Sequence, residues 1–149
     1  MSRFEEWLAG VDLDVSVRKF PEGTRTATDA ARAVGCEVGQ IVKSLVFVAG
    51  GRPVVALVSG ANRLDESRLG AEAGTPVTKA DAAVAREATG YAIGGVPPFA
   101  HATDVPVFMD RDLLAYTSVW AAAGRPDSVF EIQPERLREL SKAAVVDLK

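Results

Sequence analysis

The sequence contains very few of the side chains that build metal centres and covalent cross-links. Its 149 residues include one cysteine and one histidine, Cys36 and His101. Within one subunit this composition excludes a Cys/His zinc cluster, an internal disulfide and an iron–sulfur cluster. A single cysteine is also typical of a reducing compartment. We therefore expect a protein that holds no metal ion.

Long apolar runs and an excess of positive charge are absent as well. No apolar run reaches roughly 18 residues, the length needed to cross a membrane. The first residues, MSRFEEWLAG, are acidic where a signal peptide is basic, so we expect a cytoplasmic protein without membrane contact. The 17 Lys and Arg are outnumbered by 20 Asp and Glu, for a net charge of −3. This balance does not favour wrapping of a long nucleic acid, although it says nothing about a local pocket.

Common motifs for nucleophilic catalysis and nucleotide binding are also missing. A serine hydrolase would need a G-x-S-x-G turn, which does not occur, and would depend on the single imidazole of His101. No sequence pattern supplies a histidine that could activate Cys36, so a buried, unreactive thiol is favoured. Gly94 and Gly95 form neither G-x-G-x-x-G nor a Walker A motif, so we expect no nucleotide cofactor.

What the chain does contain is an apolar fraction of 48% with 25% charged residues, which predicts one globular domain over residues 1–149. Ser2 and Glu5 have the spacing of a capping box for a first helix, and Thr28 is the expected N-cap of a helix that ends at Gly35. Three more helices are expected over residues 63–74, after Asp81 and from Pro134. Strands are expected over residues 14–20, 44–49, 54–59, 75–79, 105–110, 116–122 and 128–133. This order predicts an α+β (mixed α/β) fold with a central mixed, largely antiparallel sheet flanked by short helices.

Two segments stand out as candidates for function. The runs 44–49 and 54–59 are almost continuously apolar and read as a hairpin buried on both faces, with Lys43 at its start. That lysine must either reach solvent or find an anionic partner, and a plain strand-edge lysine is the alternative. The segment YAIGGVPPFAH, residues 91–101, is rich in Gly and Pro and unusually apolar for a surface loop, which indicates that it lines a site. It could present backbone N–H donors, or serve only as a tight connection.

Five separated segments resemble the YbaK / prolyl-tRNA synthetase-associated (INS-like) editing domain family. They are QIVKSLVF (40–47), VALVSGANRLD (55–65), TGYAIGGVPPF (89–99), PVFMDRDLL (106–114) and IQPERLREL (132–140). The similarity covers roughly residues 24 to 142, and the five segments keep the family's order and spacing. The resemblance implies a free-standing aminoacyl-tRNA deacylase that hydrolyses the ester of a mischarged tRNA, most often Ala- or Cys-tRNA(Pro).

The resemblance also implies a set of site residues. Lys43 corresponds to the family's functional lysine, and the family's Gly-x-x-x-Pro loop maps onto residues 94–98. The catalytic set implied in this way is Lys43, Gly94, Gly95, Val96 and Pro98. The implied substrate-binding set is His101, Phe99, Ile93, Leu45, Asn62 and Arg63. The implied partners are the acceptor end of an aminoacyl-tRNA and prolyl-tRNA synthetase, with no metal and no cofactor.

The sequence departs from the family pattern at two places. Gly60-Ala61-Asn62-Arg63 stands where Gly-Asp-x-Arg is frequent, and Ala100 replaces a usual glycine. His101 is either a proton shuttle, a pocket residue or a structural residue. A non-catalytic module that binds tRNA or a synthetase on the same fold, and a hydrolase of another small activated ester, remain as alternatives.

Overall fold

The structure is a computed structural model that describes residues 3–11, 15–20 and 26–149. Within these residues eight strands form one sheet. The strands are β1 (Val17–Lys19), β2 (Ile41–Ala49), β3 (Arg52–Ser59), β4 (Val77–Lys79), β5 (Val107–Asp110), β6 (Val119–Ala122), β7 (Ser128–Ile132) and β8 (Ala144–Val146). The α-helices are α1 (Arg3–Ala9), α2 (Ala27–Val34), α3 (Glu66–Ala73), α4 (Ala82–Thr89) and α5 (Pro134–Ser141), and two 3₁₀ helices are η1 (Val38–Gln40) and η2 (Arg111–Ala115).

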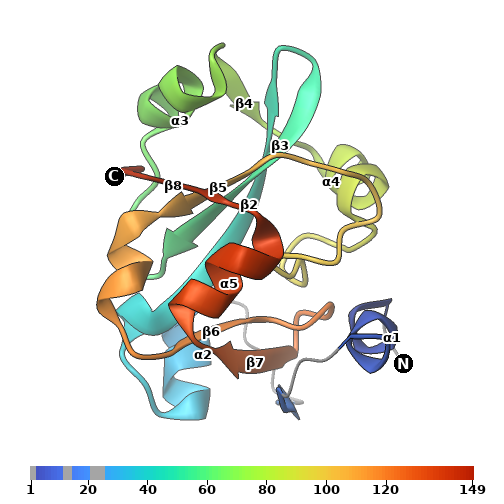
Figure 1. Cartoon of the computed structure of the whole chain (residues 1–149), viewed down its shortest axis with the longest axis vertical. Helices are drawn as coiled ribbons and strands as arrows, with labels where there is room; N and C mark the ends of the chain where they lie inside the picture. Colours follow the sequence, from blue (N-terminus) through green and yellow to red (C-terminus); the bar gives the residue numbers. More distant parts are fainter. Residues whose placement is uncertain (1–2, 12–14, 21–25) are drawn as a thin grey trace.

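The strands lie in the order β1-β7-β6-β2-β3-β5-β8, and β4 pairs separately with β2 (Figure 1). Four of the seven pairings between described strands are antiparallel, and β2–β6, β3–β5 and β5–β8 are parallel. This confirms the predicted fold class. Strand β8 was not predicted, because three residues after a helix carry too little alternation to signal a strand.

The predicted hairpin forms the centre of the sheet. Gly50 and Gly51 make its two-residue turn with φ of 56° and 84°, the left-handed backbone that such turns require. On β3, residues 55–58 are fully buried, because helices and loops cover both faces. The expected burial is confirmed for the run 54–59 on β3, whereas on β2 Ser44, Leu45 and Val48 are only half-buried.

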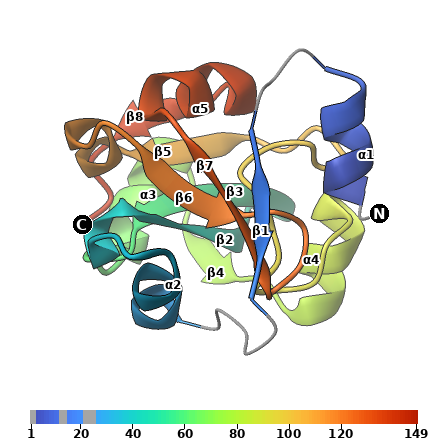
Figure 2. The ribbon, with the colours of Figure 1, turned by 90° about the horizontal axis from the view of Figure 1, so that it is seen from below.

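The two faces of the sheet carry different helices. Helix α2 packs on Ile41, Trp120 and Val129 of one face, and α3 covers the same face further along through Leu69. The opposite face is covered by α1, α4 and α5 together with the loop that follows α4. Figure 2 shows α2 and α5 on opposite sides of the strands.

The cap of α2 differs from the sequence prediction. Thr26, rather than Thr28, is the N-cap: its hydroxyl accepts a hydrogen bond from the backbone N–H of Asp29 at 3.0 Å. Both threonines precede the same alanine-rich run, so the pattern could not separate them. The left-handed Gly35 ends the helix as predicted. Of the capping box expected before α1, Ser2 lies outside the described residues.

Other element ends shift by a few residues. Helix α3 begins after its cap Asp65 and not at Arg63, whereas Asp81 caps α4 as predicted. Strand β6 begins at Val119, later than the expected position 116, because Tyr116 ends η2. Of the strand expected over residues 14–20, the structure has Val17–Lys19. These shifts leave the predicted order of elements intact.

Candidate functional site

Strand β2 has an unpaired stretch in the middle of one edge. Along its other edge β3 pairs with residues 42–49. On this edge β6 pairs only with residues 41–42 and β4 only with residues 47–49, with one further hydrogen bond from the Ala80 N–H to the Val46 carbonyl. Residues 43–45 therefore have no strand neighbour there, and the sheet forks around them.

A cleft opens at this fork. Two hollows of about 340 and 450 Å³ meet along it and share five residues: Lys43, Ser44, Leu45, Ile93 and Val96. We call the first hollow the basic lobe, because it is also bordered by Arg63, Lys79 and Glu66. We call the second the apolar lobe; it is bordered by Thr26, Ala27, Thr28, Ala30, Ile41, Val42, Gly94, Trp120, Ala121, Ala122 and Val129.

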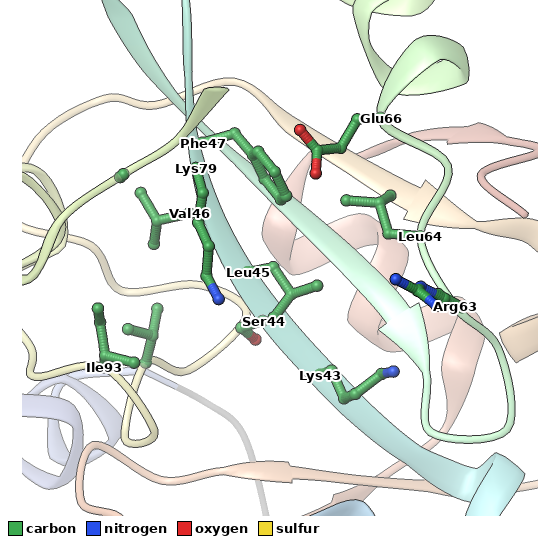
Figure 3. A pocket seen from close by; sticks show the side chains of 12 residues that line it. Lys43, Ser44, Leu45, Val46, Phe47, Arg63, Leu64, Glu66, Lys79 and Ile93 are labelled. Carbon is green, nitrogen blue, oxygen red and sulfur yellow. The ribbon is translucent and has the colours of Figure 1, made fainter. Parts of the chain in front are cut away.

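The two sides of the cleft come from segments far apart in the sequence. Figure 3 shows Arg63, Leu64 and Glu66 on one side of β2, with Ile93 on the other. Lys43 extends from β2 toward the segment that follows β3. The predicted lysine and the predicted loop thus lie on the same cleft.

Lys43 is held by a main-chain group. Its ammonium donates a hydrogen bond to the carbonyl oxygen of Asn62 at 2.7 Å. Burial lowers the pKa of Lys43, and the negative charge of Asp110 opposes that shift. Among the described residues no carboxylate lies within ion-pair distance of this ammonium. Its remaining N–H donors have no partner among the described residues.

Asn62 lies behind the lysine and does not line the cleft. Its side-chain amide donates to the carboxylates of Asp110 and Asp112, both at 2.8 Å. Asp110 is fully buried, and it also accepts from the backbone N–H of Asp112 at 3.1 Å. These bonds fasten the turn after β3 to the end of β5, and they fix the carbonyl that holds Lys43.

The loop over residues 93–98 has a tightly constrained backbone. Gly94 has φ of 93°, and a Cβ on Gly95 would lie 2.9 Å from the Cα of Arg125. The N–H of Gly95 donates to the carbonyl of Ala92 at 2.9 Å, so it is occupied within the turn. Gly94 and Val96 both border the cleft, and neither N–H has a partner among the described residues.

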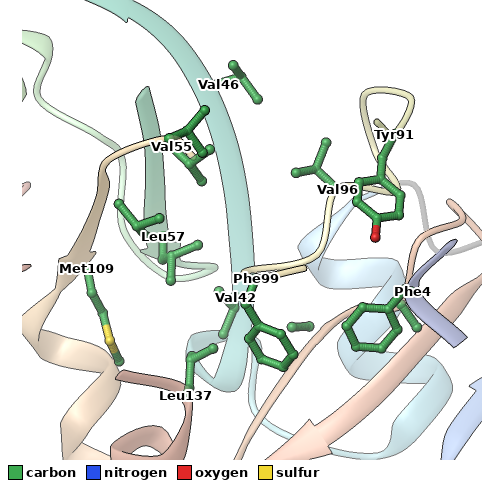
Figure 4. Packing of buried hydrophobic residues seen from close by; sticks show 14 of the residues in the cluster. Phe4, Val42, Val46, Val55, Leu57, Tyr91, Val96, Phe99, Met109 and Leu137 are labelled. Carbon is green, nitrogen blue, oxygen red and sulfur yellow. The ribbon is translucent and has the colours of Figure 1, made fainter. Parts of the chain in front are cut away.

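Three other predicted site residues support the loop from behind. Figure 4 shows Phe99 in the buried cluster beside Phe4, and its ring centroid lies 5.6 Å from that of Phe4 and 5.1 Å from that of Trp7. Pro98 is buried as well. His101 donates from Nε2 to the carbonyl of Pro97 at 2.7 Å, and burial lowers its pKa although that bond opposes the shift.

Several cleft residues have no counterpart in the sequence prediction. The cleft is also lined by Ser44 in the interior of β2, Lys79 at the end of β4, Glu66 at the start of α3 and Trp120 on β6. Only Ser44 could have been suggested, as a polar residue inside an apolar run. Cys36 lies away from the cleft, half-buried rather than buried, and burial raises the pKa of its thiol, as expected for an unreactive cysteine.

Among the described residues, no three side chains of His, Cys, Asp or Glu group in a way that could hold a metal ion. None of the helices in these residues is long and apolar enough to cross a membrane.

Comparison with known proteins identifies the family. The family model for the aminoacyl-tRNA editing domain matches residues 21–140. The chain belongs to this family, which confirms the resemblance carried by its five segments.

Individual relatives agree with that assignment. The chain is 30% identical over 145 residues to the uncharacterized protein YwhH of Bacillus subtilis, covering 97% of this chain and 90% of YwhH. It is 30% identical over 107 residues to a proline–tRNA ligase of Maridesulfovibrio salexigens, covering 71% of this chain but 18% of the ligase. A solved structure of a candidate trans-editing enzyme for prolyl tRNA synthetase matches with a TM-score of 0.87 and 50% identity, over 91% of this chain and 86% of that chain.

Proposed function

We propose that this chain is a single-domain aminoacyl-tRNA deacylase that acts in trans on Ala- or Cys-tRNA(Pro). Membership of the editing family and the similarity to a candidate trans-editing enzyme support the reaction class. The observation that carries the proposal is the cleft itself. There Lys43 borders one groove together with Gly94 and Val96, whose N–H groups have no partner among the described residues.

The reaction needs little from the protein beyond positioning. Water attacks the carbonyl carbon of the ester, the bond from that carbon to the ribose oxygen breaks, and the ribose leaves as a hydroxyl. The amino acid leaves as a carboxylate with release of a proton. The N–H groups of Gly94 and Val96 are suited to the oxygen atoms of the ester and the terminal ribose, and one well-aimed donor contributes about 10²–10³ in rate. The neighbouring ribose hydroxyl orients the water.

Positive charge and pocket shape account for the choice of substrate. Lys43 and Arg63 supply local charge for the phosphate of the terminal adenosine, so a net charge of −3 is compatible with binding of an acceptor end. The apolar lobe is bordered by small side chains such as Ala30 and Ala122. An apolar pocket distinguishes one methylene by only ~1–3 kcal/mol, so exclusion of a larger, correct amino acid is the more effective selection.

A deacylation assay tests this proposal. The protein is incubated with Ala-, Cys-, Ser- and Pro-tRNA(Pro), and release of the amino acid is followed against buffer. We expect release from Ala- or Cys-tRNA(Pro), a strong loss in Lys43→Ala, and unchanged activity in Lys19→Ala, which removes an exposed lysine on β1. Binding of tRNA or synthetase with hydrolysis no faster than in buffer would instead establish a non-catalytic module. Unchanged hydrolysis in Lys43→Ala would remove the role given to that lysine.

A further inference from the structure

The open edge of β2 exposes both main-chain groups of one residue, Ser44. In the two-residue hairpin the closing pair is Ala49 with Arg52, so alternate residues of β2 exchange hydrogen bonds with β3. The intervening positions point to the other edge, as the bond from the Ala80 N–H to the Val46 carbonyl confirms. By this alternation the N–H and C=O of Ser44 point away from β3, into the fork.

None of the polar groups of Ser44 has a partner among the described residues. Neither β6 nor β4 reaches position 44, and no other backbone hydrogen bond is made there. Its side-chain hydroxyl is buried and also without a hydrogen-bond partner. Figure 3 places Ser44 on β2 between Lys43 and Leu45, and all three border both lobes. Because buried polar groups are nearly always paired, a donor, an acceptor and a hydroxyl left open at one residue indicate a ligand-binding position.

We propose that Ser44 binds the aminoacyl group of the substrate through its main chain, as a neighbouring strand would. This inference rests on the proposed function and names the subsite for the reacting group. An aminoacyl ester carries an ammonium and a carbonyl in the same relation as the nitrogen and carbonyl of a peptide residue. The Ser44 carbonyl accepts a hydrogen bond from the α-ammonium, and the Ser44 N–H donates to the ester carbonyl.

This pairing has two consequences for the reaction. The Ser44 N–H joins the loop donors Gly94 and Val96 around the ester oxygen, so the developing negative charge is contacted from both walls of the cleft. The requirement for an ammonium also distinguishes an aminoacyl ester from other activated esters. An ester of a 2-hydroxy acid is the matched control substrate, because a hydroxyl of nearly the same size replaces the ammonium.

The first experiment compares alanyl-tRNA with lactyl-tRNA, each rate divided by its own hydrolysis in buffer. We expect kcat/KM to be at least about tenfold lower for the lactyl ester, the effect of one hydrogen bond to a charged group. Ser44→Pro removes the N–H but leaves the ladder with β3, and proline is tolerated on an open edge. We expect this variant to lose at least about tenfold in kcat/KM, whereas Ser44→Ala, which keeps the main chain, loses less.

The second experiment does not depend on catalysis or on a folded proline variant. Amide hydrogen exchange is measured by NMR with and without 3′-alanylamino-3′-deoxyadenosine, which carries an amide in place of the ester. In the free protein the Ser44 amide should exchange faster than those of Lys43 and Leu45, and the probe should slow it at least about tenfold. The 3′-lactoylamino analogue should protect it less.

The outcomes separate this inference from the proposed function. If alanyl-tRNA and lactyl-tRNA are hydrolysed with equal kcat/KM and the probe does not protect the Ser44 amide, the Ser44 subsite is overturned. The proposed deacylase activity is then still supported. Protection of Ser44 without hydrolysis of any aminoacyl-tRNA would support the subsite and overturn the reaction. A slowly exchanging Ser44 amide in the free protein would show that the group is not open, which also overturns the subsite.

Discussion

Replacing Gly95 by alanine tests how the loop is held against the rest of the molecule. A Cβ at this position would lie 2.9 Å from the Cα of Arg125 and 3.0 Å from both its carbonyl carbon and its nitrogen, whereas ordinary contact begins at 3.4 Å. Because these are backbone atoms, no side-chain rotation relieves the overlap. One of the two segments must therefore move by about 0.5 Å, the difference between those distances.

The expected cost follows from that overlap. Forcing an extra methyl group into a packed site destabilises a protein by about 1–3 kcal/mol. For a chain of this size that corresponds to a fall in melting temperature of about 3–9 °C. The same shift moves the Val96 N–H relative to β2, and a displacement of ~1 Å at a reacting centre costs about 10² in rate. We therefore expect kcat/KM for Ala- or Cys-tRNA(Pro) to fall by about tenfold in Gly95→Ala.

Thermal denaturation and the deacylation assay check both parts of this prediction. Gly51→Ala is the matched control, because that glycine has φ of 84° with no atom within 4 Å of the added Cβ and lies in the hairpin turn. It should lose stability through backbone strain of about 1–2 kcal/mol while keeping full activity. If Gly95→Ala melts within a degree of the wild type and hydrolyses its substrate normally, the close approach to Arg125 does not hold the loop.

Three further predictions concern the surroundings of the cleft. Asn62→Ala leaves the buried carboxylate of Asp110 without its side-chain donor, so the free energy of unfolding should fall by about 1–3 kcal/mol. The deacylation rate should fall as well, because the carbonyl of residue 62 that holds Lys43 is less firmly fixed, and both quantities can be measured on one preparation. Burial lowers the pKa of His101, so the folded protein favours the neutral imidazole. The stability of the wild type should therefore fall as the pH drops below about 6.5, the pKa of histidine in the unfolded chain. Denaturant titrations of His101→Gln should lack this part of the pH dependence. Arg63→Gln and Lys79→Gln should each weaken tRNA binding and reduce its salt dependence by about one phosphate contact, and a binding constant independent of both changes would contradict a basic lobe that contacts the acceptor end.

Much of the fold was accessible from local patterns. The hairpin around Gly50 and Gly51 follows from two apolar runs separated by a two-residue turn, and the helix ends at Gly35 and Asp81 follow from capping chemistry. These features depend on residues within a few positions of one another. The choice between Thr26 and Thr28 failed because two equivalent caps lie two positions apart.

The site was predicted less evenly, because the sequence of an irregular loop does not indicate where each of its side chains points. Lys43 and Val96 do border one cleft. Phe99 and His101 belong to the same short loop, yet they turn into the core and hold the loop from behind. Adjacent residues of an irregular loop point in different directions, and no periodicity indicates which of them face a ligand.

By itself the sequence determined the composition limits, the order of the five α-helices and of strands β1 to β7, the central hairpin and the family. Only the tertiary structure decided that β6 and β4 pair with opposite ends of β2 and leave Ser44 open between them. It also brought Lys79 to the cleft and placed Asn62 between Lys43 and two carboxylates. Local signals specify what each segment becomes. Which strand edges meet, and where one is left without a neighbour, depends on packing between distant segments, and the candidate site lies at such a place.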